Sequence, residues 1–197
     1  MLLCLVKNLV KCFMYCFFRL HVHGTDNFPK EGAAIVALNH KSFWDAPLIA
    51  SVLPRPLAFM AKKELFSIPV LGAILKWAGA FPVSRGNADV SAIKAALSAL
   101  RAGKVMAIFP EGTRVKNGEE HVAKAGVALI AQKTGAPVVP IALSGRYRFR
   151  AKVDVYIGTP ITIKAPDGGR LSADQLQEAS DRLLKTILDM AETGNIR

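Results

Sequence analysis

Residues 33–45 read AAIVALNHKSFWD and contain the pattern that decides the fold. The first six are apolar, as expected of a strand buried inside a sheet. A polar stretch follows, and after Asp45 the chain turns apolar again, with Pro47 in the first turn of a predicted helix over 46–53. We expect Asp45 to cap this helix, because aspartate and an early proline are both typical of helix N-termini. The segment therefore predicts a strand, a polar loop and a helix in succession.

The same alternation continues along the chain. Further strands are predicted at 57–61, 81–83, 105–109, 138–143 and 152–157. Further helices are predicted at 70–78, 90–101, 122–133 and 172–191, the last capped by Ser172 or Asp174. Strands that alternate with helices indicate an α/β fold, and we expect a single domain with a mixed, mostly parallel sheet flanked by helices. The 197 residues suffice for one such domain and are too few for two ordinary ones.

Residues 1–22 form a separate predicted unit ahead of a domain at 23–197. In the opening sequence MLLCLVKNLVKCFMYCFFRL, Lys7, Lys11 and Arg19 fall on one narrow stripe of a helix that is otherwise mostly apolar. A wide apolar face with a basic stripe and no acidic residue suits a lipid interface. The charges interrupt the run too often for a spanning helix or a signal peptide. A core helix with its basic edge in water is the alternative, and a short re-entrant insertion also fits.

The composition indicates an anionic partner. The chain has 26 Lys and Arg against 15 Asp and Glu, a net charge of +11, and 51% of its residues are hydrophobic. The positive excess is spread over both halves of the chain, so it belongs to the fold and not to a tail. Nucleic acid, an anionic membrane or acidic substrates are the partners that such a charge allows, with solubility as the alternative. The sequence shows no helix-turn-helix, zinc finger or aromatic RNA-binding motif, which argues against nucleic acid.

The three cysteines, Cys4, Cys12 and Cys16, all lie within the first 16 residues. An odd and clustered set is not a disulfide framework, and no histidine is near enough in sequence to suggest a zinc site. A reducing compartment fits these thiols, and we expect them to act as small apolar side chains.

His40 and Asp45 lie in the polar loop after the predicted strand 33–38. Histidine accepts a proton near neutral pH, and a carboxylate on its other ring nitrogen fixes the tautomer that general base catalysis requires. The four residues between them allow the chain to turn and bring Asp45 back to His40. A second interpretation stays open, in which Asp45 only caps the helix and His40 is a structural residue of the loop.

Two more polar loops follow predicted strands. Glu111 and Arg114 lie on a glycine turn after strand 105–109, where glutamate can accept from hydroxyl groups and arginine can bind phosphate oxygens. Arg85 follows strand 81–83 and is a second phosphate candidate. Because ligands of parallel sheets bind beyond the carboxyl ends of the strands, we expect the three loops to converge on one edge. A surface turn with an ion pair is the alternative for Glu111 and Arg114.

Together these segments resemble the 1-acyl-glycerol-3-phosphate acyltransferase family, within the glycerolipid acyltransferases. That family carries four blocks in a fixed order. Their counterparts here are NHKSFWD at 39–45, which matches N-H-x-S-x-x-D at every specified position, GAFPVSR at 79–85, FPEGTR at 109–114 and VVPIAL at 138–143. The first and third blocks are specific, whereas the second and fourth are weak alone. Lys124 and Gly126 also look like the basic residue and the glycine that follow the third block.

The resemblance implies a role for each candidate residue. His40 would deprotonate the acceptor hydroxyl and Asp45 would orient His40, in agreement with the chemistry of the residues themselves. Substrate binding would fall to Arg85, Glu111, Gly112, Thr113 and Arg114. The donor would be a fatty acyl thioester on acyl carrier protein or coenzyme A. The acceptor would be the sn-2 hydroxyl of lysophosphatidic acid, which gives phosphatidic acid for phospholipid biosynthesis, and neither a metal nor a cofactor is implied.

The acceptor is the least determined part of this interpretation. Another lysolipid or glycerol 3-phosphate would also fit, because a loop with glutamate and arginine recognises hydroxyl and phosphate groups in general. A non-catalytic membrane lipid-binding protein would account for the basic charge, although it gives no reason for His40 beside Asp45. The amphipathic helix, the thiols and the thioester donor lead us to expect a peripheral or monotopic protein on the cytoplasmic face of the cell membrane.

Overall fold

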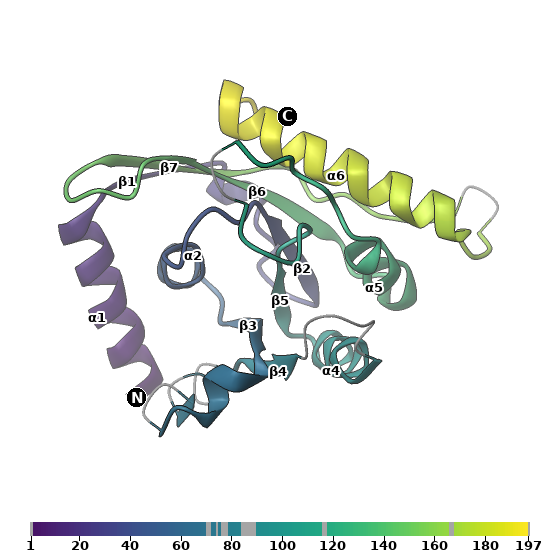
Figure 1. The fold of residues 1–197 in the computed structure, drawn as a ribbon, viewed down its shortest axis with the longest axis horizontal. Coiled ribbons are helices and arrows are strands. Elements are labelled where there is room, and N and C mark those ends of the chain that lie inside the picture. The colour runs from purple at the N-terminus through teal and green to yellow at the C-terminus, as the bar shows by residue number, and fades with distance from the viewer. Residues whose placement is uncertain are drawn as a thin grey trace.

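The centre of the fold is a seven-stranded sheet (Figure 1). The computed structural model describes residues 2–69, 72–73, 75, 79–83, 90–115, 118–165 and 168–196, with backbone alone for 2–7, so that the predicted helix 70–78 lies largely outside it. In spatial order the strands are β1 (Arg19–His23), β7 (Lys152–Ile157), β6 (Val138–Gly145), β2 (Ala34–Leu38), β5 (Val105–Ile108), β3 (Leu57–Lys62) and β4 (Phe81–Val83). β6 and β7 run antiparallel, and every other neighbouring pair is parallel. The predicted α/β class and mostly parallel sheet are confirmed.

Helices cover both faces of the sheet (Figure 1). They are α1 (Leu2–Phe17), α2 (Asp45–Val52), α4 (Val90–Arg101), α5 (Gly126–Thr134) and α6 (Ala173–Thr193), with 3-10 turns η1 (Thr25–Asn27) and η2 (Lys63–Ser67). α1 and α2 lie on one face, and α4, α5 and α6 lie on the other. Cys12 and Cys16 on α1 are exposed free thiols. Within the described part of the chain, no helix is long and apolar enough to cross a membrane.

β2 shows why the sheet has a core on each face. All five of its residues are buried, and it is paired on both sides, with β5 and with β6. Successive side chains of a strand point to opposite faces. Val36 and Leu38 therefore pack on the side of α1 and α2, whereas Ile35 and Ala37 pack on the side of α4, α5 and α6. A strand buried on both faces needs an apolar residue at every position, which explains the unbroken apolar run in the sequence.

The N-terminal segment differs from the helix predicted over 1–22. The helix ends at Phe17, and the chain continues directly into β1 at the edge of the sheet. Phe18 is buried in the core, and the Arg19 amide donates to the Ala151 carbonyl at 2.9 Å. These contacts divert the backbone from the helical path into pairing with β7. Arg19 therefore belongs to the sheet and not to the basic stripe of the helix.

The two C-terminal helices differ in how well their starts were predicted. α5 begins at Gly126 and not at the start of the predicted range 122–133. The backbone before it is bound elsewhere, because the Lys124 amide donates to the Pro110 carbonyl at 2.9 Å. α6 begins after Ser172, whose side chain forms a capping box, so one of the two predicted caps is confirmed.

Candidate active site

Two of the three predicted loops meet at the carboxyl edge of the sheet. One follows β2 and contains His40, and the other follows the neighbouring parallel strand β5 and contains Glu111. The His40 amide donates to Glu111 Oε1 at 3.3 Å, and the Val115 amide donates to the His40 carbonyl at 2.9 Å. The third loop, with Arg85, lies outside the described residues. The structure therefore brings together the loops of His40 and Glu111.

The imidazole of His40 is held by Asp45. Its Nδ1 lies 2.8 Å from Asp45 Oδ2, and the carboxylate is fully buried while 14% of the His40 side chain is exposed. An ionised carboxylate can only accept hydrogen bonds, so Nδ1 is the nitrogen that carries the proton, and in the neutral imidazole Nε2 keeps its lone pair. The Phe109 ring stacks on the imidazole with centroids 3.8 Å apart, which fixes the plane of the ring. The pair has the arrangement of a general base with its orienting carboxylate.

Asp45 does not cap α2 in the way predicted. It is the first residue of the helix, and Trp44 takes the N-cap position without a side-chain hydrogen bond. The carboxylate is instead bound by the preceding loop, where Oδ2 accepts from the amides of Lys41 and Ser42 at 2.7 and 2.8 Å. The loop wraps around the carboxylate before the helix begins. The carboxylate therefore accepts from the amides of the loop and not from the first amides of the helix.

A further donor to Asp45 comes from a distant part of the chain. The Tyr147 hydroxyl, in the turn after β6, donates to Oδ1 at 2.5 Å across a sequence separation of 102 residues. Burial raises the pKa of the Tyr147 hydroxyl well above its usual value, and the charge and hydrogen bond of Asp45 raise it further. The hydroxyl therefore stays protonated as a donor. Tyr147 was not predicted from the sequence. The feature that could have drawn attention to it is its position between arginines in the string RYRFR at 146–150.

Asn39 fixes the start of the loop that carries His40. Its side chain is buried and binds β6 twice: Oδ1 accepts from the Leu143 amide at 2.8 Å, and Nδ2 donates to the Leu143 carbonyl at 3.0 Å. An amide side chain offers the same donor and acceptor as a peptide group. Asn39 thus continues the pairing of β2 with β6 beyond the end of the strand, and the next residue, His40, is held at the sheet edge.

Glu111 is buried, in contrast to the surface turn that was the alternative interpretation. Only 1% of its side chain is exposed, and Oε1 lies 3.1 Å from Nδ1 of His121 as well as accepting from the His40 amide. Oε2 is also buried and has no hydrogen-bond partner among the described residues. His121 lies in the irregular segment ahead of α5 and was not predicted. The carboxylate therefore braces the His40 loop against this segment.

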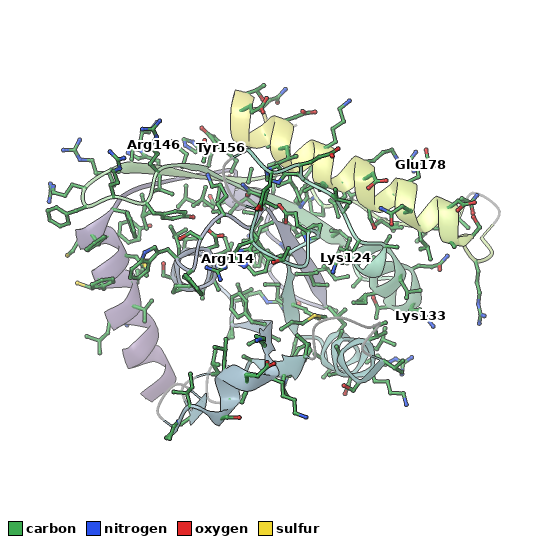
Figure 2. All side chains as sticks on the ribbon, in the orientation of Figure 1. Arg114, Lys124, Lys133, Arg146, Tyr156 and Glu178 are labelled. Atoms are coloured by element: carbon green, nitrogen blue, oxygen red, sulfur yellow. The ribbon has the colours of Figure 1, made fainter. Side chains whose placement is uncertain are left out.

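The other residues of the FPEGTR block form a cationic rim beside His40. Gly112 has a φ of 69°, which favours glycine, and the Lys124 side chain lies against it. Thr113 is exposed, and the guanidinium of Arg114 lies over the Phe43 ring, 3.4 Å from its centroid. Figure 2 shows Arg114 and Lys124 in the middle of the view, near the loops after β2 and β5. Two cationic side chains on or against this loop are chemically suited to an anionic group.

A mostly parallel sheet with a histidine held by a buried aspartate at its carboxyl edge is an arrangement typical of enzymes that use a general base. The described residues contain no group of three or more His, Cys, Asp and Glu side chains that could hold a metal ion. The chain belongs to the Acyltransferase family, which it matches over residues 19–144. That range contains both loops of the site, and Tyr147 lies just beyond it.

Among curated proteins, the chain is similar to 1-acyl-sn-glycerol-3-phosphate acyltransferases. It is 37% identical to that of Bacillus subtilis over 146 residues, which are 71% of this chain and 72% of the relative. It is 31% identical to that of Streptococcus pneumoniae over 171 residues, 83% of this chain and 62% of the relative. Among solved structures, the 1-acyl-sn-glycerophosphate acyltransferase PlsC of Thermotoga maritima has 28% identity and a TM-score of 0.73, over 98% of this chain and 81% of that chain. The resemblance indicated by the four blocks is confirmed.

Proposed function

We propose that this acyltransferase moves a fatty acyl group from a thioester to the sn-2 hydroxyl of 1-acyl-glycerol-3-phosphate and forms phosphatidic acid. The observation that carries the proposal is the His40–Asp45 pair, whose Nδ1 and Oδ2 atoms are 2.8 Å apart, beside the cationic loop of Arg114. The acceptor in the names of the relatives carries a hydroxyl group and a phosphate group. These are the two groups that such a site would bind.

In the proposed reaction, Nε2 of His40 takes the proton of the acceptor hydroxyl while the oxygen attacks the thioester carbonyl. A C–O bond forms, the tetrahedral intermediate collapses, the C–S bond breaks, and the leaving thiolate takes the proton from the imidazolium. Asp45 stays ionised and stabilises the imidazolium between these two steps. A thioester is already activated, so a base and correct positioning supply much of what the reaction needs.

We assign the acceptor phosphate to the rim of the site. Arg114 offers a planar pair of donors to phosphate oxygens, and Gly112 and Thr113 share its loop. Lys124 joins them in this proposal because its side chain lies against Gly112. Arg85, outside the described residues, keeps its predicted place as a further phosphate ligand.

Glu111 enters the proposal chiefly as a positioning residue, although the sequence placed it among the substrate-binding residues. Its side chain is 1% exposed, and its Oε1 atom accepts from the His40 amide. A carboxylate in this position fixes the backbone of the catalytic histidine. The acceptor then contacts the outer residues of the same loop.

The donor is proposed to be a thioester of acyl carrier protein or of coenzyme A. Acyl carrier protein is acidic and coenzyme A carries phosphates, so the net charge of +11 supports both. Another lysolipid or glycerol 3-phosphate would present the same phosphate and hydroxyl to Arg114 and His40. These acceptors belong in the same assay as lysophosphatidic acid.

We propose that the protein works as a peripheral or monotopic protein on the cytoplasmic face of the cell membrane, with α1 against anionic lipid. Met14 packs into the core, while Leu9 and Phe13 are exposed on the same helix together with Lys11. The helix thus contributes one face to the core and keeps apolar side chains exposed elsewhere. An exposed apolar stripe with a basic residue beside it supports a place at the lipid interface.

The test is acyl transfer by the purified protein in liposomes, from both thioesters to lysophosphatidic acid. His40→Ala is expected to lower kcat by about 10²–10⁴-fold, the usual contribution of a general base, with an unchanged circular dichroism spectrum. His21→Ala, an exposed histidine on the edge strand β1, is the matched control and should keep the wild-type rate. Near-normal turnover by His40→Ala would contradict the proposed base.

The same assay separates the alternatives. Product formed from another lysolipid or from glycerol 3-phosphate alone would change the acceptor and keep the reaction. Liposome binding without thioester consumption, across every acceptor, would favour a non-catalytic lipid-binding protein. That second candidate is motivated by the exposed face of α1 and by the net charge.

A further inference from the structure

The turn between β6 and β7 carries a dense group of positive charges. Residues 146–150 read RYRFR, so three arginines alternate with two aromatic residues, and we call this segment the arginine turn. Tyr147 is partly buried and binds Asp45, whereas all three arginines are exposed. None of these arginines forms an ion pair with another described residue. Their charge is therefore available to an outside partner.

The arginine turn is fastened to the end of α1. The Arg150 amide donates to the carbonyl of Phe17, the last residue of the helix, at 2.7 Å. The rings of Phe149 and Phe17 meet edge to face with centroids 5.3 Å apart. Arg150 has a φ of 57°, a left-handed conformation that a non-glycine residue keeps only when surrounding contacts determine it. The turn therefore has a defined shape and a defined position relative to α1.

Aromatic side chains continue from the arginine turn onto the helix. Phe17 also stacks with Phe13 and with Trp44, at centroid distances of 5.4 and 6.0 Å. Within this cluster, Phe149 is 68% exposed and Phe13 is 47% exposed. Figure 1 shows the turn beside the upper end of α1, and Figure 2 shows Arg146 at the same edge of the molecule. Positive charge and exposed aromatic surface thus lie together.

We propose that the arginine turn is a docking site for the phosphate groups of an anionic phospholipid bilayer, and that Tyr147 links this site to Asp45. Guanidinium groups pair with phosphate oxygens, and exposed phenylalanines beside them enter the lipid interface. This inference deepens the membrane location proposed above and rests on it. The arginines and Tyr147 alternate in one short turn, so the segment that meets the lipid also supports Asp45. The bilayer then holds the His40–Asp45 pair at a fixed depth.

An acidic protein surface would match the same three arginines, and two observations favour the bilayer. Phe149 and Phe13 present apolar surface directly beside the charges, as an interfacial segment does. Lys11 is exposed on α1 and extends the positive charge along the helix. A protein partner is accordingly one outcome of the test.

The experiment compares two variants that each lose three positive charges, one from the arginine turn and one from the helices on the other face of the sheet. The turn variant combines Arg146→Gln, Arg148→Gln and Arg150→Asn, with asparagine at 150 because it tolerates the left-handed conformation. The control variant combines Lys94→Gln, Lys133→Gln and Lys185→Gln, three exposed residues of α4, α5 and α6. These helices lie on the other face of the sheet, and Figure 2 shows Lys133 on the opposite side of the molecule from Arg146.

Binding is measured by co-sedimentation with vesicles of phosphatidylcholine, with and without phosphatidylglycerol. The turn variant should need about 100-fold more of the anionic vesicles than the wild type, because each basic residue near an anionic surface contributes about a factor of five. The control variant should change by less than about fivefold, since its charges lie on helices of the other face of the sheet and solvent ions screen distant charges. Phe149→Ala keeps every charge and should weaken binding to both kinds of vesicle.

Equal weakening in the two triple variants, or no weakening in the turn variant, would overturn the proposal. A second outcome would also overturn the proposal: a turn variant that binds vesicles normally and loses turnover with acyl-carrier-protein thioesters but not with coenzyme A thioesters. The turn would then dock the carrier protein. Folding is checked by thermal melting and by turnover of a water-soluble, short-chain lysophosphatidic acid, which the turn variant should retain. If the wild type transfers no acyl group, the proposed function fails, whereas vesicle binding needs no turnover and still decides this inference.

Discussion

Asp45 is a single residue on which the geometry of the site depends. Its carboxylate accepts from the imidazole of His40, from two amides of its own loop and from the Tyr147 hydroxyl. A fully buried charge is costly unless hydrogen bonds satisfy it, and four donors do so here. The orientation of the His40 imidazole consequently depends on the loop before α2 and on the turn after β6.

We predict that Tyr147→Phe lowers kcat about tenfold or more and leaves KM for the acceptor nearly unchanged. Phenylalanine fills the same space but leaves Oδ1 of Asp45 without this donor. A hydrogen bond to a charged group contributes about 1.5–3 kcal/mol, and about 1.4 kcal/mol corresponds to a tenfold change in rate. Tyr156→Phe, in β7 beside His23, is the matched control. Steady-state kinetics would contradict the positioning role if KM rose and kcat stayed constant.

Glu111→Gln decides whether this carboxylate positions His40 or binds the acceptor. If it braces the loop, we expect kcat to fall about tenfold at constant acceptor KM, because one weakened hydrogen bond to a charged group has about this effect. Glu120→Gln, an exposed residue of the nearby irregular segment, should have no effect on either constant. A rise in KM for lysophosphatidic acid alone would show that Glu111 binds the acceptor, as the sequence pattern predicted.

The predictable residues are those whose partners are close in the sequence. His40 and Asp45 share one short loop, so their spacing suggested a contact that the structure shows. Tyr147 and His121 reach the site from other segments, and their places follow from the path of β6 and of the chain before α5. The N-cap prediction for Asp45 was wrong for a related reason, since the carboxylate bonds to the loop amides that surround it.

Among the elements, the buried strands were predicted well and the edge strand β1 was not. β2 and β5 are apolar at every position, and β6 begins with six apolar residues, because both of their faces are covered. β1 reads RLHVH and alternates exposed with partly buried residues, and it directly follows an apolar helix. Because one face of β1 is exposed to solvent, the strand mixes polar and apolar residues. The sequence pattern of the helix α1 therefore seemed to continue through β1.

Asp154 of β7 has one charged neighbour on β1 and another on its own strand. Asp154 Oδ1 lies 3.0 Å from Nε2 of His23, and its Oδ2 lies 3.1 Å from Nζ of Lys152. Burial acts to raise the pKa of Asp154, but the hydrogen bonds and charges of His23 and Lys152 outweigh it and hold that pKa below its usual value. A lowered pKa stabilises the fold above the unfolded value of about 3.9, and this contribution is lost as pH falls through the folded value.

We therefore predict that Asp154→Asn changes the stability of the protein in a pH-dependent way. Near pH 7 the variant should melt a few degrees below the wild type, as a loss of about 1 kcal/mol implies for a domain of this size. The difference should shrink as the pH falls through the unfolded value of about 3.9 and then through the lower value of the folded state. Asp189→Asn, an exposed residue of α6, is the control in the same melting experiments. A difference that does not vary with pH would contradict the linkage.

For the whole molecule, the α/β class could be predicted because buried parallel strands and covering helices leave a strong pattern. The order of the strands could not, since β1 joins the sheet beside β7, from the far end of the chain. The net charge of +11 was also plain from the sequence. That the three arginines of the arginine turn lie beside α1 became visible only when the fold placed the two segments together.

The net charge predicts how membrane binding responds to salt. We expect the wild type to bind vesicles with phosphatidylglycerol tightly at low salt and to lose most of this binding by about 0.5 M NaCl, because added ions shorten the range of the attraction. The apolar face of α1 should leave a weak residual binding. Vesicle flotation over a series of salt concentrations measures both the electrostatic and the residual apolar binding. Binding that does not change with salt concentration would contradict an electrostatic contribution.

The pairing of β1 with β7 also sets an order of events during synthesis. Asn27, just after β1, bonds to Ile157 at the end of β7 across a separation of 130 residues. At roughly 5–20 residues per second, the ribosome takes on the order of ten seconds to make this partner. During that interval α1 and β1 have no completed sheet to join, and the apolar surface of the helix is open to lipid. This edge of the sheet can therefore close only after β7 has been made.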